Sequence, residues 1–275
     1  MSTSTMTVSV SDNIAKVELS RPGAFNSMNR AFWGEIREVF TRLNDDPEVR
    51  VAVLSSSGKH FTAGLDLKEF AGIGADAAGD MGRRREAFRR MVLNMQESFN
   101  VIERARVPVL AAIQGGCIGG GVDMVTACDM RYCTANAFFC VKEIAIAITA
   151  DVGTLQRLPR LIPDGLAREL AFTGRNLSAE EARACGLVNQ VFPDHTAMLE
   201  GVMAIARTIA GHSPLAMTGT KEMLNYGRDH SIADSLNYVA TWNAAMLAGE
   251  DLPEAMKASR ERRAPSYAGL QKPML

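Results

Sequence analysis

Three carboxylates in apolar surroundings are the side chains of this sequence best suited to acid–base chemistry. Asp123 lies one turn into an expected helix of Val, Met and Ala residues, and Glu143 follows an expected strand over residues 137–141. Asp151 comes shortly afterwards. A carboxyl group that is buried without a cation keeps its proton to a higher pH, so it can give or take a proton near neutrality. Asp151 also fits a purely structural role as the N-cap of a following helix, and the sequence alone leaves both roles open.

Two glycine-bearing loops each follow an expected buried strand and precede an expected helix. The first runs from His60 to Asp66 (HFTAGLD) and the second from Gln114 to Gly121 (QGGCIGGG). The second is too rich in glycine for a regular element and leads into a helix over 122–128, whose unpaired N–H groups favour negative charge. Side by side, the loops could each direct one N–H to the same oxygen, forming an oxyanion hole. The plainer interpretation is two tight turns, with Asp66 stabilising its own loop.

Other catalytic patterns are absent from the sequence. It has neither G-x-G-x-x-G nor the Gly-Lys-Ser/Thr of phosphate-binding loops, and no Gly-x-Ser-x-Gly nucleophile motif. The four histidines form no pair at helical spacing and the five cysteines form no C-x-x-C pair, so no metal site is expected. We expect the cysteines to be small buried residues in a reducing compartment.

The composition is that of an ordinary globular protein, with 275 residues, 47% of them hydrophobic. Thirty Lys and Arg residues oppose 31 Asp and Glu, so no strong field attracts nucleic acid or an anionic membrane. No apolar run approaches the ~18–20 residues that cross a bilayer, and the first residues lack the features of a signal peptide. We therefore expect a cytoplasmic protein with neither nucleic-acid nor membrane partners.

The periodicity of apolar residues predicts an α/β fold that becomes all-α towards its end. A hairpin is expected over 7–19, and Asn29 is expected to cap a helix that reaches Leu43. Further strands are expected at 49–54, 107–113, 137–141 and 187–191, a loop at 72–82, and helices at 83–104, 122–128, 152–161, 165–173, 178–186, 197–210, 215–226, 232–248 and 254–262. The sequence thus divides into a core with the active site over 1–195 and a helical region over 196–275. We expect that region to pack on a partner subunit and to close the pocket.

These motifs resemble those of the crotonase superfamily, the enoyl-CoA hydratase/isomerase group. The resemblance rests on Phe61–Asp66 (FTAGLD), Ile113–Asp123 (IQGGCIGGGVD) and the segment from Glu143 into Gly153–Leu158 (GTLQRL), and it covers nearly the whole chain. It implies an α/β, crotonase-like spiral of ββα units with a C-terminal α-helical trimerisation region. It also implies a homotrimer or homohexamer that takes an acyl-CoA thioester. No metal or redox cofactor is implied, since coenzyme A is part of the substrate.

Within the superfamily, the chain is most similar to the Δ3,5-Δ2,4-dienoyl-CoA isomerases. Hydratases of the superfamily carry glutamate at the positions of Asp123 and Glu143 and usually glycine at position 151, whereas these isomerases carry the Asp/Glu/Asp set. Three further segments strengthen the similarity: Arg131-Tyr-Cys133, residues 150–157 and Ala240-Thr-Trp-Asn243.

The resemblance implies that the protein converts 3,5-dienoyl-CoA to 2,4-dienoyl-CoA in fatty-acid β-oxidation. The backbone N–H groups of Ala63 and Gly120 would hold the thioester oxygen. Glu143 would take a proton from C2 and Asp151 would deliver one to C6, or the reverse, while Asp123 keeps one partner protonated or orients it. The residues implied to bind substrate are Thr62, Ala63, Gly64, Leu65, Asp66 and Gly120. The alternatives are a 2-enoyl-CoA hydratase that uses Asp123 and Glu143, and a non-catalytic relative with the same fold.

Overall fold

The computed structural model describes residues 2–70, 80–272 and 274, and two β-sheets form its centre. The strands of the large sheet are, in spatial order, β1 (Met6–Ser11), β2 (Ile14–Leu19), β3 (Val51–Ser56), β4 (Val109–Ile113), β6 (Met130–Thr134) and β9 (Gln190–Phe192). The strands of the small sheet are β5 (Gly116–Ile118), β7 (Phe138–Cys140) and β8 (Leu177–Ser178). The expected hairpin is confirmed as the antiparallel pair β1–β2, and the other neighbours in the large sheet pair in parallel.

Successive turns of the chain add one strand to each sheet. Strand β4 of the large sheet is followed by β5 of the small sheet, and β6 is followed in the same way by β7. The turn that begins with β3 repeats this in reduced form, because Thr62 makes a parallel bridge to Cys117 of β5. This order agrees with the predicted spiral of ββα units, and it brings the loops after β3 and β4 next to each other.

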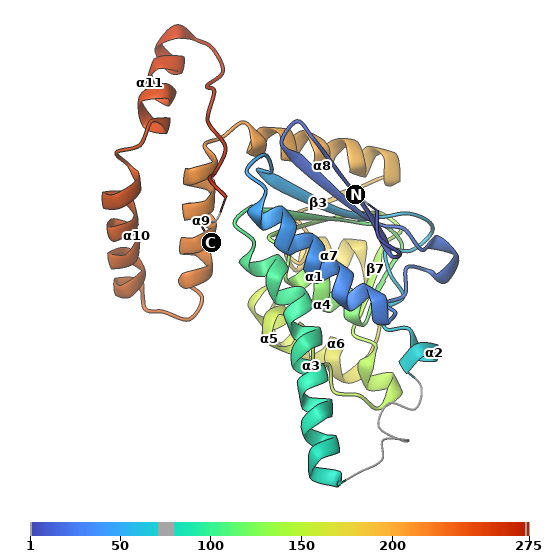
Figure 1. The fold of residues 1–275 in the computed structure, drawn as a ribbon. Coiled ribbons are helices and arrows are strands. Elements are labelled where there is room, and N and C mark those ends of the chain that lie inside the picture. The colour runs from blue at the N-terminus through green and yellow to red at the C-terminus, as the bar shows by residue number, and fades with distance from the viewer. Residues whose placement is uncertain (1, 71–79, 273, 275) are drawn as a thin grey trace.

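Helices cover both faces of the large sheet (Figure 1). Their bounds are α1 (Arg30–Asp45), α2 (Leu67–Phe70), α3 (Met81–Arg104), α4 (Gly120–Thr126), α5 (Thr154–Arg157), α6 (Asp164–Thr173), α7 (Ala179–Ala184), α8 (His195–Ala210), α9 (Pro214–Tyr226), α10 (Ile232–Met246) and α11 (Asp251–Glu261), with 3-10 turns η1 (Pro22–Ala24), η2 (Glu143–Ile146) and η3 (Leu158–Arg160). Asn29 caps α1 as predicted, its side chain accepting from the N–H of Phe32. The predicted capping box of α7 is present between Ser178 and Glu181.

The large sheet separates two hydrophobic cores because successive side chains of a strand point to opposite faces. In β3, Ala52 and Leu54 join the larger core, whereas Val51 and Val53 face the smaller one. Helix α8 closes the smaller core with residues spaced four apart, namely Met198, Val202, Ala206 and Ala210. The first helix of the predicted C-terminal region therefore packs directly on the sheet.

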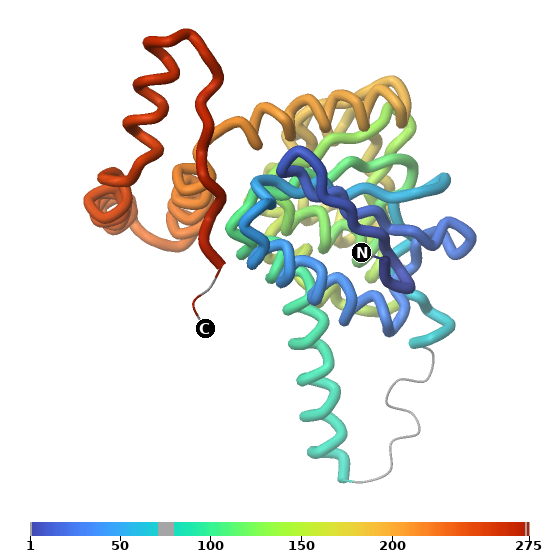
Figure 2. The backbone as a smooth tube through the Cα atoms, turned by 45° about the horizontal axis from the view of Figure 1, so that its top comes forward, coloured from blue at the N-terminus to red at the C-terminus, as the bar shows by residue number. Residues whose placement is uncertain are grey.

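Helices α9, α10 and α11 stand beside the sheet-containing body (Figures 1 and 2). Helix α9 is attached to it by the ammonium of Lys221, which donates to Asp129 Oδ2 at 2.8 Å and to the carbonyl of Val107 at 3.0 Å. Helix α10 packs on α9 but has no buried residue of its own in this single chain, and its Ile232 is 81% exposed. Among the described residues, none of the helices combines the length and hydropathy that a bilayer crossing requires.

The structure corrects two expectations about local structure. The loop over 114–121 was expected to be irregular, but Gly116–Ile118 is strand β5 and α4 begins at Gly120. Pairing with β7 provides hydrogen-bond partners that offset the low strand preference of glycine. The helix expected over 152–161 is instead a single turn, α5, followed by the 3-10 turn η3. Most of the loop expected at 72–82 lies outside the described residues.

Candidate active site

The two glycine-bearing loops touch through Gly64. Strands β3 and β4 are neighbours, so both loops leave the same edge of the sheet. Gly64 has a φ of +80°, and a Cβ there would lie 2.5 Å from the carbonyl oxygen of Ile118 and 3.4 Å from the nitrogen of Gly120. Because a side chain would collide with backbone, this approach requires glycine. The predicted side-by-side arrangement of the loops is therefore present.

The backbone N–H of Ala63 is already used inside the protein. It donates to the carbonyl oxygen of Phe25 at 2.9 Å, so it is not free to hold a substrate oxygen as the sequence led us to expect. The next but one residue, Leu65, pairs with Met28 in a parallel bridge that uses the carbonyl of Gly64 and the N–H of Asp66. That pattern turns the N–H of Leu65 away from Met28. Within the described residues, the Leu65 N–H has no hydrogen-bond acceptor.

Gly120 supplies a second free amide. It is the first residue of α4, where the N–H groups of a helix have no partner inside the helix. Its own N–H makes no hydrogen bond among the described residues. A Cβ at Gly120 would lie 2.8 Å from the sulfur of Met28, which explains the need for a small residue. Leu65 and Gly120, rather than Ala63 and Gly120, are thus the pair of available donors.

Thr62 and Asp66 make contacts that maintain the first loop. The hydroxyl of Thr62 is fully buried, donates to the carbonyl of Asn26 at 2.7 Å and accepts from the N–H of Gly64 at 3.1 Å. Asp66 accepts from the hydroxyl of Ser27 at 2.9 Å, and this hydrogen bond lowers the pKa of Asp66. These contacts fit the role of Asp66 in stabilising its own loop. Direct binding of substrate by Thr62 or Asp66 stays a prediction.

Asp123 is a fully buried acid in the middle of α4. Its Oδ1 accepts the backbone N–H of Thr154 at 2.5 Å, whereas its Oδ2 has no partner among the described residues. Burial, together with the nearby negative charge of Glu143, raises the pKa of Asp123 to about 7. The group can therefore carry a proton at neutral pH, as the sequence predicted for an acid in apolar surroundings.

Glu143 lies beside the glycine-rich turn and within electrostatic reach of Asp123. A Cβ on Gly119 would be 3.2 Å from Glu143 Oε1, so this carboxyl lies beside the start of α4. Its Oε2 is buried without a hydrogen-bond partner among the described residues. Burial raises the pKa of Glu143, and the charge of Glu143 contributes to the raised pKa of Asp123. The two carboxyls thus interact electrostatically, and such a pair can share one proton.

Asp151 lies at the rim of this group. The residue as a whole is exposed, yet the protein around its carboxyl desolvates it enough to raise the pKa of Asp151. Its charge also raises the pKa of Asp123 and of Glu143, so the three acids lie within electrostatic reach of one another. Asp151 does not cap α5, because Gly153 holds the N-cap position. The N-cap role that the sequence left open is thereby removed.

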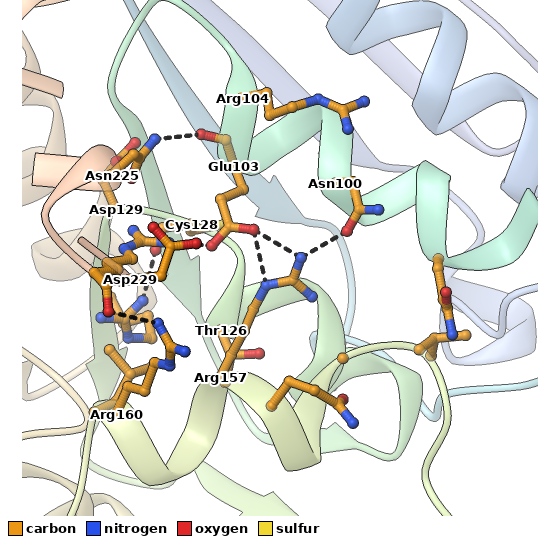
Figure 3. A pocket seen from close by; sticks show the side chains of 17 residues that line it. Asn100, Glu103, Arg104, Thr126, Cys128, Asp129, Arg157, Arg160, Asn225 and Asp229 are labelled. Atoms are coloured by element: carbon orange, nitrogen blue, oxygen red, sulfur yellow. Dashed lines mark hydrogen bonds and ion pairs between the residues drawn. The ribbon is translucent and has the colours of Figure 1, made fainter. Parts of the chain in front are cut away.

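A polar cavity adjoins the loop that carries Asp151 (Figure 3). It measures ≈ 680 Å³ and reaches the acid-bearing loop at Val152 and Gly153. Its wall is polar and includes an ion pair of 2.8 Å between Arg157 of α5 and Glu103 of α3. The cavity therefore adjoins the segment that follows Asp151, and Thr126 at the end of α4 also lines it.

Sequence reasoning missed three features of the site. The free N–H of Leu65 depends on the alternation of amides along a bridge, and the sequence does not contain that register. Thr154 acts through its backbone N–H, which no side-chain motif reports. Gln96 of α3 donates to the carbonyl of Asp151 at 2.7 Å, across a separation of 55 residues.

The fold and site have relatives among known proteins. Residues 9–271 match the family described as Enoyl-CoA hydratase/isomerase, so the chain belongs to this family. A crystal structure of an enoyl-CoA hydratase from Bacillus anthracis superposes with a TM-score of 0.88 at 32% identity, covering 97% of this chain and 100% of that one. The predicted crotonase-like fold is confirmed.

Two of the most similar relatives carry the same kind of name. The chain is 48% identical over 257 residues to the mitochondrial Delta(3,5)-Delta(2,4)-dienoyl-CoA isomerase of Homo sapiens, covering 93% of this chain and 78% of that protein. It is 46% identical over 254 residues to the peroxisomal Delta(3,5)-Delta(2,4)-dienoyl-CoA isomerase of Arabidopsis thaliana, covering 92% and 91%. The predicted similarity to these isomerases is confirmed.

Proposed function

We propose that this protein is an isomerase that converts 3,5-dienoyl-CoA to 2,4-dienoyl-CoA in the oxidation of unsaturated fatty acids. The observation that carries the proposal is the third acid, Asp151, at the rim of a coupled pair formed by Asp123 and Glu143. A transfer from C2 to C6 spans most of the extended diene, so two separately placed groups suit it better than one. The names of the isomerase relatives support the same assignment.

The first step is removal of a proton from C2 of the bound thioester. Glu143 takes this proton, the electrons of the C2–H bond form a C1–C2 double bond, and the π electrons of the C1–O bond move onto the thioester oxygen. The N–H groups of Leu65 and Gly120 stabilise the resulting oxyanion. Such a donor typically contributes about 3–4 kcal/mol to lowering the barrier. These two amides replace the pair expected from the sequence, since Ala63 donates to Phe25.

The second step returns a proton at the far end of the diene. As the carbonyl re-forms, the C1–C2, C3–C4 and C5–C6 double bonds become C2–C3 and C4–C5 double bonds, and C6 takes the proton of Asp151. The proton on Glu143 later restores Asp151 through solvent or Asp123. Proton number and charge therefore balance over the cycle. The reverse assignment, with Asp151 as the base and Glu143 as the acid, uses the same atoms.

Asp123 serves the other two acids rather than the substrate. It is fully buried and accepts from Thr154, which favours a role in holding and sharing a proton with Glu143. A carboxyl with a pKa of about 7 exchanges its proton readily at neutral pH. This coupling lets one acid be charged while its neighbour is neutral.

We further propose that the protein works as a homotrimer or homohexamer joined through α9–α11. The exposed apolar residues of these helices support this, because single chains seldom leave such a surface uncovered. The cytoplasmic location expected from the sequence stays a prediction, since the relatives named above are mitochondrial and peroxisomal.

The test compares two substrates with the purified protein. With 3,5-dienoyl-CoA, we expect the ultraviolet absorbance of a 2,4-dienoyl thioester to appear, together with deuterium at C6 when the reaction runs in D₂O. With 2-enoyl-CoA, we expect little loss of the enoyl absorbance. Rapid hydration of 2-enoyl-CoA without isomerisation would identify a hydratase instead, and absence of turnover and binding with both substrates would indicate a non-catalytic relative.

A further inference from the structure

One face of α3 contacts the segment that carries Asp151. Gln96, Asn100 and Glu103 are spaced four and three residues apart, so they lie on the same side of the helix. The Nε2 of Gln96 donates to the carbonyl oxygen of Asp151 at 2.7 Å. Further along the helix, Asn100 Oδ1 accepts from Arg157 at 2.7 Å, and Glu103 Oε2 accepts from the same guanidinium at 2.8 and 3.2 Å.

The attachment at Arg157 is sheltered and strong. The side chains of Arg157 and Glu103 are only 14% and 22% exposed, and Arg228 of the chain segment after α9 also pairs with Glu103. Although burial works to raise it, the pairing with the two arginines holds the pKa of Glu103 below its ordinary value. Figure 3 shows Glu103 and Asn100 converging on the guanidinium of Arg157. This end of the segment is therefore held firmly to α3.

At its other end, where Asp151 lies, the segment over residues 151–157 has fewer contacts with α3. Thr154 is tied to Asp123, and Gly153 turns the chain with a φ of +134° that disfavours any other residue. Among the described residues, the backbone of Asp151 itself receives one side-chain hydrogen bond, which Gln96 donates. The position of the exposed Asp151 carboxyl therefore depends on Gln96.

We propose that Gln96 is a positioning residue, whose hydrogen bond to the Asp151 carbonyl holds the Asp151 carboxyl at the C6 end of the substrate. This inference rests on the proposed function. Glu143 is held by other elements, since it begins η2 and lies beside Gly119. Loss of the Gln96 contact should therefore affect delivery of the proton at C6 and leave its removal at C2 intact.

The experiment separates these two half-reactions in Gln96→Met, which keeps the length of the side chain but removes the N–H donor. Gln96→Lys keeps an N–H donor at this position and tests whether such a donor restores the contact with the Asp151 carbonyl. Asn94→Met is the matched control, because Asn94 is exposed and lies on the opposite side of α3. Each variant is assayed for isomerisation of 3,5-dienoyl-CoA, for exchange of the C2 hydrogen with D₂O, and, without substrate, for amide hydrogen exchange of the peptide that contains residues 150–157.

In Gln96→Met we expect isomerisation to slow about tenfold, with C2 exchange within about twofold of the parent protein. Amide exchange at residues 151–154 should speed up about tenfold. Gln96→Lys should recover most of both losses, and Asn94→Met should show neither. If Gln96→Met does not fold, Gln96→Asn, whose amide is too short to reach the carbonyl, is measured with the same expectations.

Two results would overturn the positioning role. One is unchanged isomerisation and unchanged amide exchange in the donor-free variant. The other is an equal fall in isomerisation and C2 exchange, which would mean a general structural effect. If the parent protein does not isomerise 3,5-dienoyl-CoA, the proposed function fails, whereas the amide exchange measurement still decides whether Gln96 holds the segment.

Discussion

The backbone N–H of Thr154 donates to Oδ1 of Asp123 at 2.5 Å, which joins the acid in α4 to the loop that carries Asp151. The other oxygen of Asp123 has no partner among the described residues, and the carboxyl of Glu143 interacts with it electrostatically. Asp123 thus connects the two acids assigned to the ends of the diene. Its protonation should affect both the stability of the fold and the state of its neighbours.

The pH dependence of stability should reveal the proton on Asp123. Its pKa is about 7 in the folded protein, above the 3.8 of an ordinary aspartate, so the folded state holds a proton that the unfolded state has lost. Stability from this group is therefore fully present below about pH 4 and is lost as the pH rises towards 7. Relative to Asp123→Asn, the parent protein should lose on the order of 3 kcal/mol across this window. Urea unfolding at pH 4.5, 6 and 8, at one protein concentration, measures the difference.

Asparagine is a suitable comparison because its Oδ1 can still accept the N–H of Thr154. A difference between the two proteins that does not change with pH would mean that Asp123 ionises like an ordinary aspartate. The raised pKa assigned to it here would then be wrong.

Replacing Asp151 by asparagine should separate the two proton transfers. Asparagine keeps the size of the side chain but cannot deliver a proton, so isomerisation should fall by about 10²–10⁴-fold. Because Glu143 and the two amides remain, exchange of the C2 hydrogen in D₂O should persist, and NMR can follow both reactions. An Asp151→Asn protein that isomerises at the parent rate would reject the assignment of Asp151, and loss of C2 exchange with retained binding would favour the reverse assignment.

Much of the fold could be predicted from the sequence because the elements depend on local patterns. The stripe of Phe32, Ile36 and Phe40 and the Asn29 cap define α1 without reference to other segments. The glycine-rich stretch was misjudged because β5 exists through pairing with β7, a contact between distant residues. The same limit applies to α8, whose helical pattern was clear while its packing on the large sheet was not visible in the sequence.

The candidate site also has features that local sequence reveals and others that depend on tertiary pairing. The acids Asp123, Glu143 and Asp151 could be found because ionisable residues in apolar runs are conspicuous. The sequence pointed to the N–H of Ala63, but in the structure that N–H donates to Phe25 and the N–H of Leu65, turned away from Met28, has no acceptor among the described residues. That difference depends on the bridge register, which is a tertiary property.

Backbone ester substitution can test the amide donors directly. An ester in place of the peptide bond before Leu65 removes its N–H and leaves every side chain unchanged. We expect isomerisation and C2 exchange to fall together by about 10²–10³-fold, as for the loss of one oxyanion donor. The matched substitution before Ala63 removes the hydrogen bond to Phe25, so it should lower stability by about 1 kcal/mol and leave catalysis nearly intact. The opposite pattern would restore Ala63 as the donor.

The close approach of the two loops predicts a severe effect for Gly64→Ala. A Cβ would meet the carbonyl of Ile118 at 2.5 Å while the backbone stays at a φ of +80°, so the loops must separate. We expect a loss of about 2–3 kcal/mol in stability and at least 10²-fold in turnover. Gly165→Ala in α6 is the control, because nothing lies within 4 Å of its Cβ, and it should be neutral or slightly stabilising. Normal turnover in Gly64→Ala would show that the loop contact is not needed for the oxyanion site.

The apolar face of α10 predicts how the protein assembles. Ile232 and Leu236 are 81% and 63% exposed in the single chain and lie one helical turn apart, so they share a face. Burying a side chain of this size typically contributes about 1.5–3 kcal/mol, and a charge in its place would have to be desolvated. We expect the double variant Ile232→Lys, Leu236→Lys to sediment as a monomer under conditions in which the parent protein is a trimer or hexamer. Asn237→Lys adds a charge to an exposed position of the same helix and should leave assembly unchanged. If the double variant keeps the parent sedimentation coefficient, the subunits associate through another surface. If the parent protein is itself monomeric, the apolar face of α10 does not serve assembly.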